Sequence, residues 1–158
     1  MIRKTALTFA ALTLACSAQA GTFSLTGSFD AAPGVNVLTG TFSFDDAVVA
    51  NGGFDGTFNL TALTLSFQGQ TYTLAQAMDP YVQFEGGTLT GPNARFVTTT
   101  GGTLDLTSFF GASNFNYAAG GLDQGGTLTI SAVPEPESYA LMLGGLGLVG
   151  WMARRRKA

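Results

Sequence analysis

Apolar and polar side chains alternate one by one through the middle of the chain, and this period of two limits the possible folds most. The alternation is clearest in residues 23–29, 63–67 and 128–130. Successive side chains of a β-strand point to opposite faces, so each such run predicts a strand with one face toward a core. The other face carries mainly Thr, Ser and Gln, which tolerate water and favour strands. The pattern therefore predicts an all-β domain.

The order of the strands is only partly constrained by their spacing. Alternating runs recur roughly every ten residues, which predicts about eight to ten antiparallel strands in a β-sandwich, with a partly open β-barrel as the alternative. The apolar residues of this stretch lie at even positions up to Leu60 and at odd positions from Leu63 onward. This change predicts a β-bulge or bend near Thr61 and Ala62. The pair Gln68-Gly69, between two alternating runs, predicts a hairpin turn.

Residues 1–20 have the features of a secretory signal peptide, expected to form a signal helix. Two basic residues precede an apolar stretch, and Ala18-Gln19-Ala20 matches a signal peptidase site, so we expect cleavage before Gly21. Cys16 leaves a lipoprotein signal as an alternative. Cleavage at Ala20 gives a mature chain without cysteine, and therefore without a disulfide. The expected partners at this end are the Sec translocon and signal peptidase.

The C-terminal 26 residues have three parts: a proline-containing motif (133–138), an apolar segment (139–153) and a basic end (154–158). The motif contains Val133, Pro134, Glu135 and Pro136, and the basic end contains Arg154, Arg155, Arg156 and Lys157. Prolines keep the motif extended, as a protease requires. The apolar segment predicts a single transmembrane helix, although a bilayer core of ~30 Å exceeds the length of so few residues at ~1.5 Å each. The basic cluster should stop transfer and stay in the cytoplasm.

This tail resembles the PEP-CTERM sorting signal of Gram-negative bacteria, part for part. The resemblance implies an exosortase, a membrane-embedded cysteine protease, as partner, with a transient inner-membrane intermediate and cutting near the motif. It also implies delivery to the cell surface or extracellular matrix and a link to biofilm and exopolysaccharide. It implies no biochemical activity for residues 21–132, because the domains that carry this tail vary widely.

Residues 21–132 are strongly acidic. They contain one base, Arg95, and eight acids, which gives a net charge of −7. The acids are Asp30, Asp45, Asp46, Asp55, Asp79, Glu85, Asp105 and Asp123. Such a domain should not bind nucleic acid, whose phosphates attract cationic surfaces.

The chemistry available to this domain is narrow, so we expect no enzyme activity, no catalytic residues and no cofactor. The whole chain lacks His, and residues 21–132 lack Cys and Lys, which excludes imidazole, thiolate and Schiff-base catalysis there. A hydrolase using carboxylates alone stays a distant alternative. Asp45, Asp46 and Asp55 lie in or beside one loop-rich stretch and are weak candidates for calcium ligands, with solvated loop charges as the preferred interpretation.

Aromatic residues offer a second functional class. Tyr81, Phe109, Phe110, Phe115 and Tyr117 would form a sugar-binding platform if they were exposed, although core packing explains most of them better. The sequence thus favours an exported, non-enzymatic surface or matrix protein. A carbohydrate-binding module with the same sorting tail is the alternative.

Overall fold

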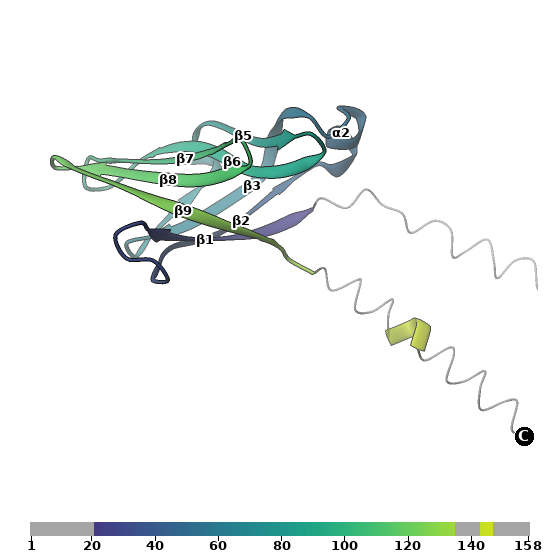
Figure 1. Cartoon of the computed structure of the whole chain (residues 1–158), viewed down its shortest axis with the longest axis horizontal. Helices are drawn as coiled ribbons and strands as arrows, with labels where there is room; N and C mark the ends of the chain where they lie inside the picture. Colours follow the sequence, from purple (N-terminus) through teal and green to yellow (C-terminus); the bar gives the residue numbers. More distant parts are fainter. Residues whose placement is uncertain (1–20, 135–142, 147–158) are drawn as a thin grey trace, which may run out of the picture.

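The computed structural model describes residues 21–134 and 143–146, and shows an all-β domain that includes one short helix, followed by a separate helical turn at residues 143–146 (Figure 1). The elements, in chain order, are β1 (Thr22–Phe29), β2 (Asn36–Phe44), α2 (Asp46–Asn51), β3 (Gly56–Phe67), β4 (Gln70–Thr73), the 3-10 turn η1 (Leu74–Gln76), β5 (Met78–Glu85), β6 (Thr88–Val97), β7 (Thr103–Phe109), β8 (Ala112–Ala119) and β9 (Leu122–Ala132). The expected all-β, antiparallel class is confirmed.

The strands form one closed sheet and do not form the two sheets of the expected sandwich. Neighbours follow the order β2-β1-β9-β8-β7-β6-β5-β3-β4, and an additional pairing between β2 and β3 closes the sheet. Eight strands thus close into an antiparallel barrel. β4 lies outside this circuit and pairs only with the second half of β3, whose first half pairs with β5. The sandwich is therefore not confirmed. The structure is closer to the alternative, a partly open barrel, but its circuit of eight strands is fully closed.

Two local predictions are confirmed on β3. Ser43 of β2 pairs with Ala62, whereas the next residue, Phe44, pairs with Leu60, so Thr61 is the extra residue of a β-bulge. This bulge turns both Leu60 and Leu63 toward the core despite their odd spacing. β3 and β4 are joined by Gln68 and Gly69, which have φ values of 50° and 75°, as a tight hairpin requires.

The core fills the inside of the barrel with aromatic and branched side chains. Phe67, from β3, packs edge-on against Tyr117 of β8 with ring centroids 5.0 Å apart. The ring centroid of Phe29, on β1, lies 5.3 Å from that of Phe115, on β8, so rings from strands that are not direct neighbours meet in the core. Phe42, Phe67, Phe96 and Phe115 are almost completely buried. Each such side chain contributes about 1.5–3 kcal/mol by leaving water, which explains why the alternation is so regular.

The predictions for the two ends of the chain fall largely on residues that the structure does not describe. The signal helix over residues 1–20 lies outside the described residues, as do residues 139–142 and 147–153 of the expected transmembrane helix. Among residues 21–134 and 143–146, no helix is long and apolar enough to cross a bilayer. The transmembrane helix over 139–153 therefore stays a prediction.

Candidate functional site

The sorting motif begins where the barrel ends. Ala132, the last residue of β9, pairs with Phe23 of β1, and the backbone N–H of Val133 still donates to the carbonyl of Thr22 over 2.9 Å. Pro134 follows and has no N–H to extend the ladder. The first residue of the motif is thus held by the barrel, and the ladder of backbone hydrogen bonds ends at Pro134. Glu135 and Pro136 lie outside the described residues, as does the basic cluster 154–157.

Both expected processing points lie at the same end of the barrel. Gly21 immediately precedes β1, and β1 runs beside β9, so the first and last residues of the domain are neighbours (Figure 1). Ala18 and Ala20, the other residues of the predicted signal peptidase site, lie outside the described residues. A chain cut at both points would keep the whole barrel.

The three weak calcium candidates have separate places around α2. The Asp45 carboxylate caps this helix by accepting hydrogen bonds from the N–H groups of Ala47 and Val48, at 2.9 and 3.3 Å. Asp46 lies in the first helical turn, where a carboxylate is favourable. Asp55 accepts from the N–H of Gly86, in the β5–β6 turn. In the part of the chain that the structure describes, no three acidic, His or Cys residues gather to hold a metal ion.

Another carboxylate fixes the β7–β8 turn. Glu85, at the end of β5, accepts hydrogen bonds from the N–H groups of Phe110 and Gly111, both at 2.9 Å. Phe110 occupies the left-handed region with φ of 50°, which is unusual for an aromatic residue. Its side chain is 85 % exposed. Glu85 therefore holds an aromatic residue outward in a defined position.

The five aromatic candidates separate into core and surface. Phe115 and Tyr117 are buried, so core packing accounts for them. Phe109 and Phe110 are exposed, and their ring centroids lie 4.2 Å apart. Tyr81 is half-buried and lines a hollow on the outer surface. The platform predicted from sequence is thus reduced to three residues, on β5 and at the β7–β8 turn.

That hollow, which sequence analysis did not predict, contains the domain's single base. It has a volume of about 260 Å³ and is lined by residues of β5, β6 and β7. Arg95, 61 % exposed, donates from Nε to the carboxylate of Asp105. This hydrogen bond, followed by the charge of Asp105, raises the pKa of Arg95 above its usual value, and the charge of Asp79 adds to the effect. Arg95 therefore stays charged and paired.

The comparisons with known proteins bear on the tail and not on the barrel. The family model described as the PEP-CTERM protein-sorting motif matches residues 132–157. No curated protein and no solved structure matches the chain. The match covers the motif, the apolar segment and the basic end, and so confirms the resemblance drawn from those residues. The chain thus carries a PEP-CTERM protein-sorting motif at residues 132–157, and this motif indicates an exported protein that an exosortase sorts to the cell surface.

Proposed function

We propose that the chain is a non-enzymatic protein of the cell surface or extracellular matrix. In this proposal an exosortase cuts it from a transient inner-membrane intermediate, and the released barrel associates with exopolysaccharide in the biofilm. The Sec translocon and signal peptidase act first, at the N-terminal end. The observation that carries the proposal is the continuity of barrel and sorting motif at Ala132 and Val133, which makes the entire barrel the cargo.

The acidic residues support a non-catalytic role, because five of the eight hold turns or strands together. Asp45 caps α2, Asp55 and Glu85 accept hydrogen bonds from turn N–H groups, and Asp105 pairs with Arg95. Asp30, in the β1–β2 loop, accepts from the hydroxyl of Thr127 on β9. Contacts of this kind stabilise turns and strand pairings, so these five acids have structural partners within the barrel.

Fractionation of cells in three genetic backgrounds tests this proposal. In cells with the exosortase, most of the chain should be recovered with the extracellular matrix. In cells without the protease it should stay with the inner membrane, because the tail is not removed. In cells that make the protease but no exopolysaccharide, it should appear in the medium. An identical distribution in all three backgrounds would contradict both the sorting step and the matrix association.

A carbohydrate-binding module with the same tail is the second candidate. The exposed pair Phe109 and Phe110, together with the half-buried Tyr81, favours it, because sugars pack their apolar faces against aromatic rings. The two candidates share the sorting route and differ in whether the barrel recognises a defined sugar structure.

A further inference from the structure

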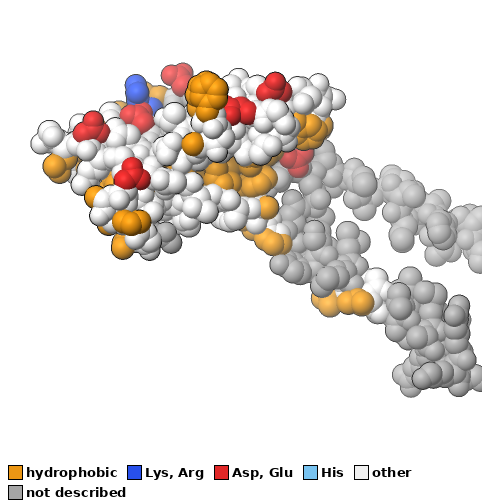
Figure 2. Space-filling view, viewed as in Figure 1, with side chains coloured by type: hydrophobic (Ala, Val, Ile, Leu, Met, Phe, Trp, Pro, Cys, Tyr) orange, Lys and Arg blue, Asp and Glu red, His pale blue; other side chains and the backbone are white. Residues whose placement is uncertain are grey.

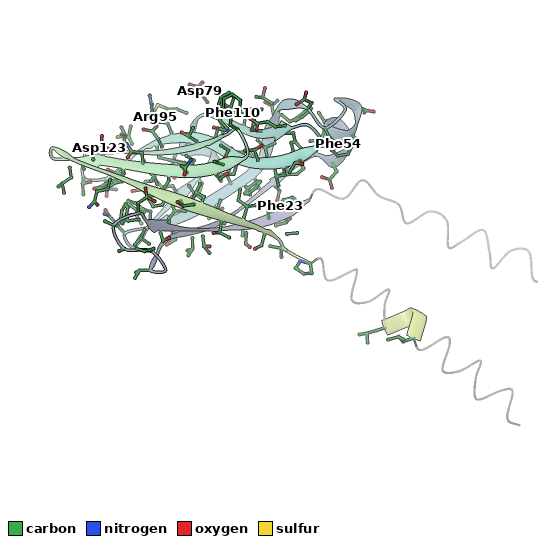
Figure 3. All side chains as sticks on the ribbon, in the orientation of Figure 1. Phe23, Phe54, Asp79, Arg95, Phe110 and Asp123 are labelled. Carbon is green, nitrogen blue, oxygen red and sulfur yellow. The ribbon has the colours of Figure 1, made fainter. Side chains whose placement is uncertain are left out.

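The outer face of β5, β6 and β7 contains a site built from side chains that face the same hollow. Its lining includes Met78, Asp79 and Tyr81 from β5, Arg95 from β6, and Asp105 and Thr107 from β7. Cross-strand register brings them together, because Met78 pairs with Arg95 and Arg95 pairs with Asp105. Figure 3 shows Asp79 and Arg95 on the same upper side of the barrel as Phe110.

The hollow exists because both strand pairs are irregular at this point. On β5 the register shifts between Met78 and Tyr81, and Asp79 adopts φ of 49°, a left-handed conformation that Asp tolerates better than most residues. Between β6 and β7, backbone pairing stops at Ala94, and the side chain of Asn93 takes over. The Oδ1 atom of Asn93 accepts from the N–H of Ser108 over 2.8 Å, and its Nδ2 donates to the carbonyl of the same residue over 3.3 Å.

These contacts make the floor of the hollow rigid. Asn93 is buried and uses both ends of its amide, so defined hydrogen bonds continue the contact between β6 and β7 where the backbone pairing ends. The Ser108 hydroxyl in turn donates to the carbonyl of Pro92 over 2.9 Å. A preorganised hollow loses little conformational entropy when a ligand binds.

The chemistry of the hollow fits a sugar ring. Tyr81 provides an aromatic surface, and the side chains of Arg95, Asp105, Asp79 and Thr107 provide donors and acceptors for hydroxyl groups. Only Nε of Arg95 bonds to Asp105, so the two NH₂ groups of its guanidinium and the second carboxylate oxygen extend the hydrogen-bonding surface. At about 260 Å³, the hollow is slightly smaller than a typical drug-sized pocket, which suits one monomer unit of a longer chain.

The charges indicate which sugars fit. Arg95 is the only base among residues 21–134 and 143–146, and two carboxylates, Asp79 and Asp105, lie in the same hollow. Figure 2 shows this pattern, with basic atoms next to acidic ones on this side of the barrel. The hollow therefore has a net negative charge within a domain of net charge −7. An anionic polysaccharide would be repelled, whereas an uncharged one would not.

We propose that this hollow, built on Tyr81, Arg95 and Asp105, is a binding subsite for an uncharged polysaccharide. The inference rests on the proposed association with exopolysaccharide and specifies its site and ligand class. The register continues the polar surface beyond the hollow, because Asp105 pairs with Asn116 and Thr107 with Asn114 on β8. Three strand spacings of ~4.8 Å separate β5 from β8, so the surface accommodates a short oligosaccharide across the strands.

The test measures retention and affinity of the full chain, purified in a detergent without a sugar headgroup. The probes are uncharged glucan, mannan and galactan oligosaccharides, with alginate fragments as the anionic comparison. The wild-type chain should bind at least one uncharged probe and not alginate. Tyr81→Leu, which keeps apolar volume without the ring, and Asp105→Asn should each weaken that binding about tenfold or more. Binding should change little with salt, because the ligand carries no charge.

Asp123→Asn is the matched control, because it makes the same charge change on an exposed residue of β9, outside the lining of the hollow (Figure 3). It should leave affinity unchanged, and equal thermal unfolding of all variants excludes a folding defect. The inference is overturned if no uncharged probe binds, if alginate binds better, or if Asp105→Asn and Asp123→Asn behave alike. Sorting of the wild-type chain is scored separately. Normal matrix recovery of the wild-type chain, together with no binding of any uncharged probe, would refute the subsite alone, whereas failed sorting of the wild-type chain would refute the proposed function.

Discussion

Changing Pro134, Glu135 and Pro136 to alanine together should leave export intact and trap a longer, membrane-bound form of the chain. Proline disfavours helix and favours an extended backbone, so replacing both prolines by alanine should let the peptide become helical and continue into the apolar segment. A protease that must align an extended peptide should then cut on the order of 10²-fold more slowly. The measurement is immunoblotting of membrane and extracellular fractions after pulse labelling.

The control for this experiment is Glu137→Ala, which removes a charge within residues 133–138 but retains Val133 and the Pro134-Glu135-Pro136 sequence. It should be processed at the wild-type rate. If the triple variant reaches the matrix as fast as this control, the motif has no role in cutting, and the tail would have to be released by another signal.

Gly40→Ala should strongly destabilise the barrel. Gly40 lies in β2, between Leu25 of β1 and Leu65 of β3, and so at the pairing that closes the sheet. A Cβ atom there would lie 2.3 Å from the carbonyl oxygen of Thr64 and 2.7 Å from a methyl group of Leu65. Because the first neighbour is backbone, relief requires β2 and β3 to separate. We expect a loss of about 1–3 kcal/mol or more in the free energy of unfolding, which lowers the Tm by roughly 10 °C.

Gly125→Ala on β9 is the matched control for closure. A Cβ atom at Gly125 would meet only the carboxylate of Asp30, at 3.4 Å, which is ordinary contact. Alanine should be neutral or slightly stabilising there, because glycine loses more backbone freedom on folding. Thermal unfolding followed by circular dichroism compares the two. Equal Tm values for the variants would mean that β2 and β3 do not approach each other as the closed barrel requires.

The sequence was sufficient to predict individual strands and not their closure. Alternation around Leu63 and Leu65 shows which face is buried, and the parity change locates the bulge at Thr61, because both depend on neighbours along the chain. A buried face can meet a second sheet or the inside of its own sheet, and the alternation is the same in both cases. The β2–β3 pairing that decides between them joins strands separated by α2 and has no local signature.

The sorting motif was predictable from the sequence, whereas the hollow was not. The three parts of the tail are continuous stretches, so their pattern is visible along the chain. Arg95 and Asp105 meet only through cross-strand register. The hollow beside them lies where backbone pairing ends and the Asn93 side chain bonds to Ser108 instead. The one sequence signal that pointed to the hollow was that Arg95 is the single base of residues 21–132. Phe115 and Tyr117 could have been assigned to the core from sequence, because they alternate with Asn114 and Asn116.

The most direct test of the sorting account is the mass of the C-terminal peptide of the wild-type chain, recovered from the envelope and the medium of cells with and without the exosortase. With the protease, the recovered chain should end at or near Pro134-Glu135-Pro136. Without it, the chain should keep Ala158 and remain in the membrane fraction. An intact Ala158 terminus in both strains would contradict the account, because the tail would then be a plain anchor that no protease removes.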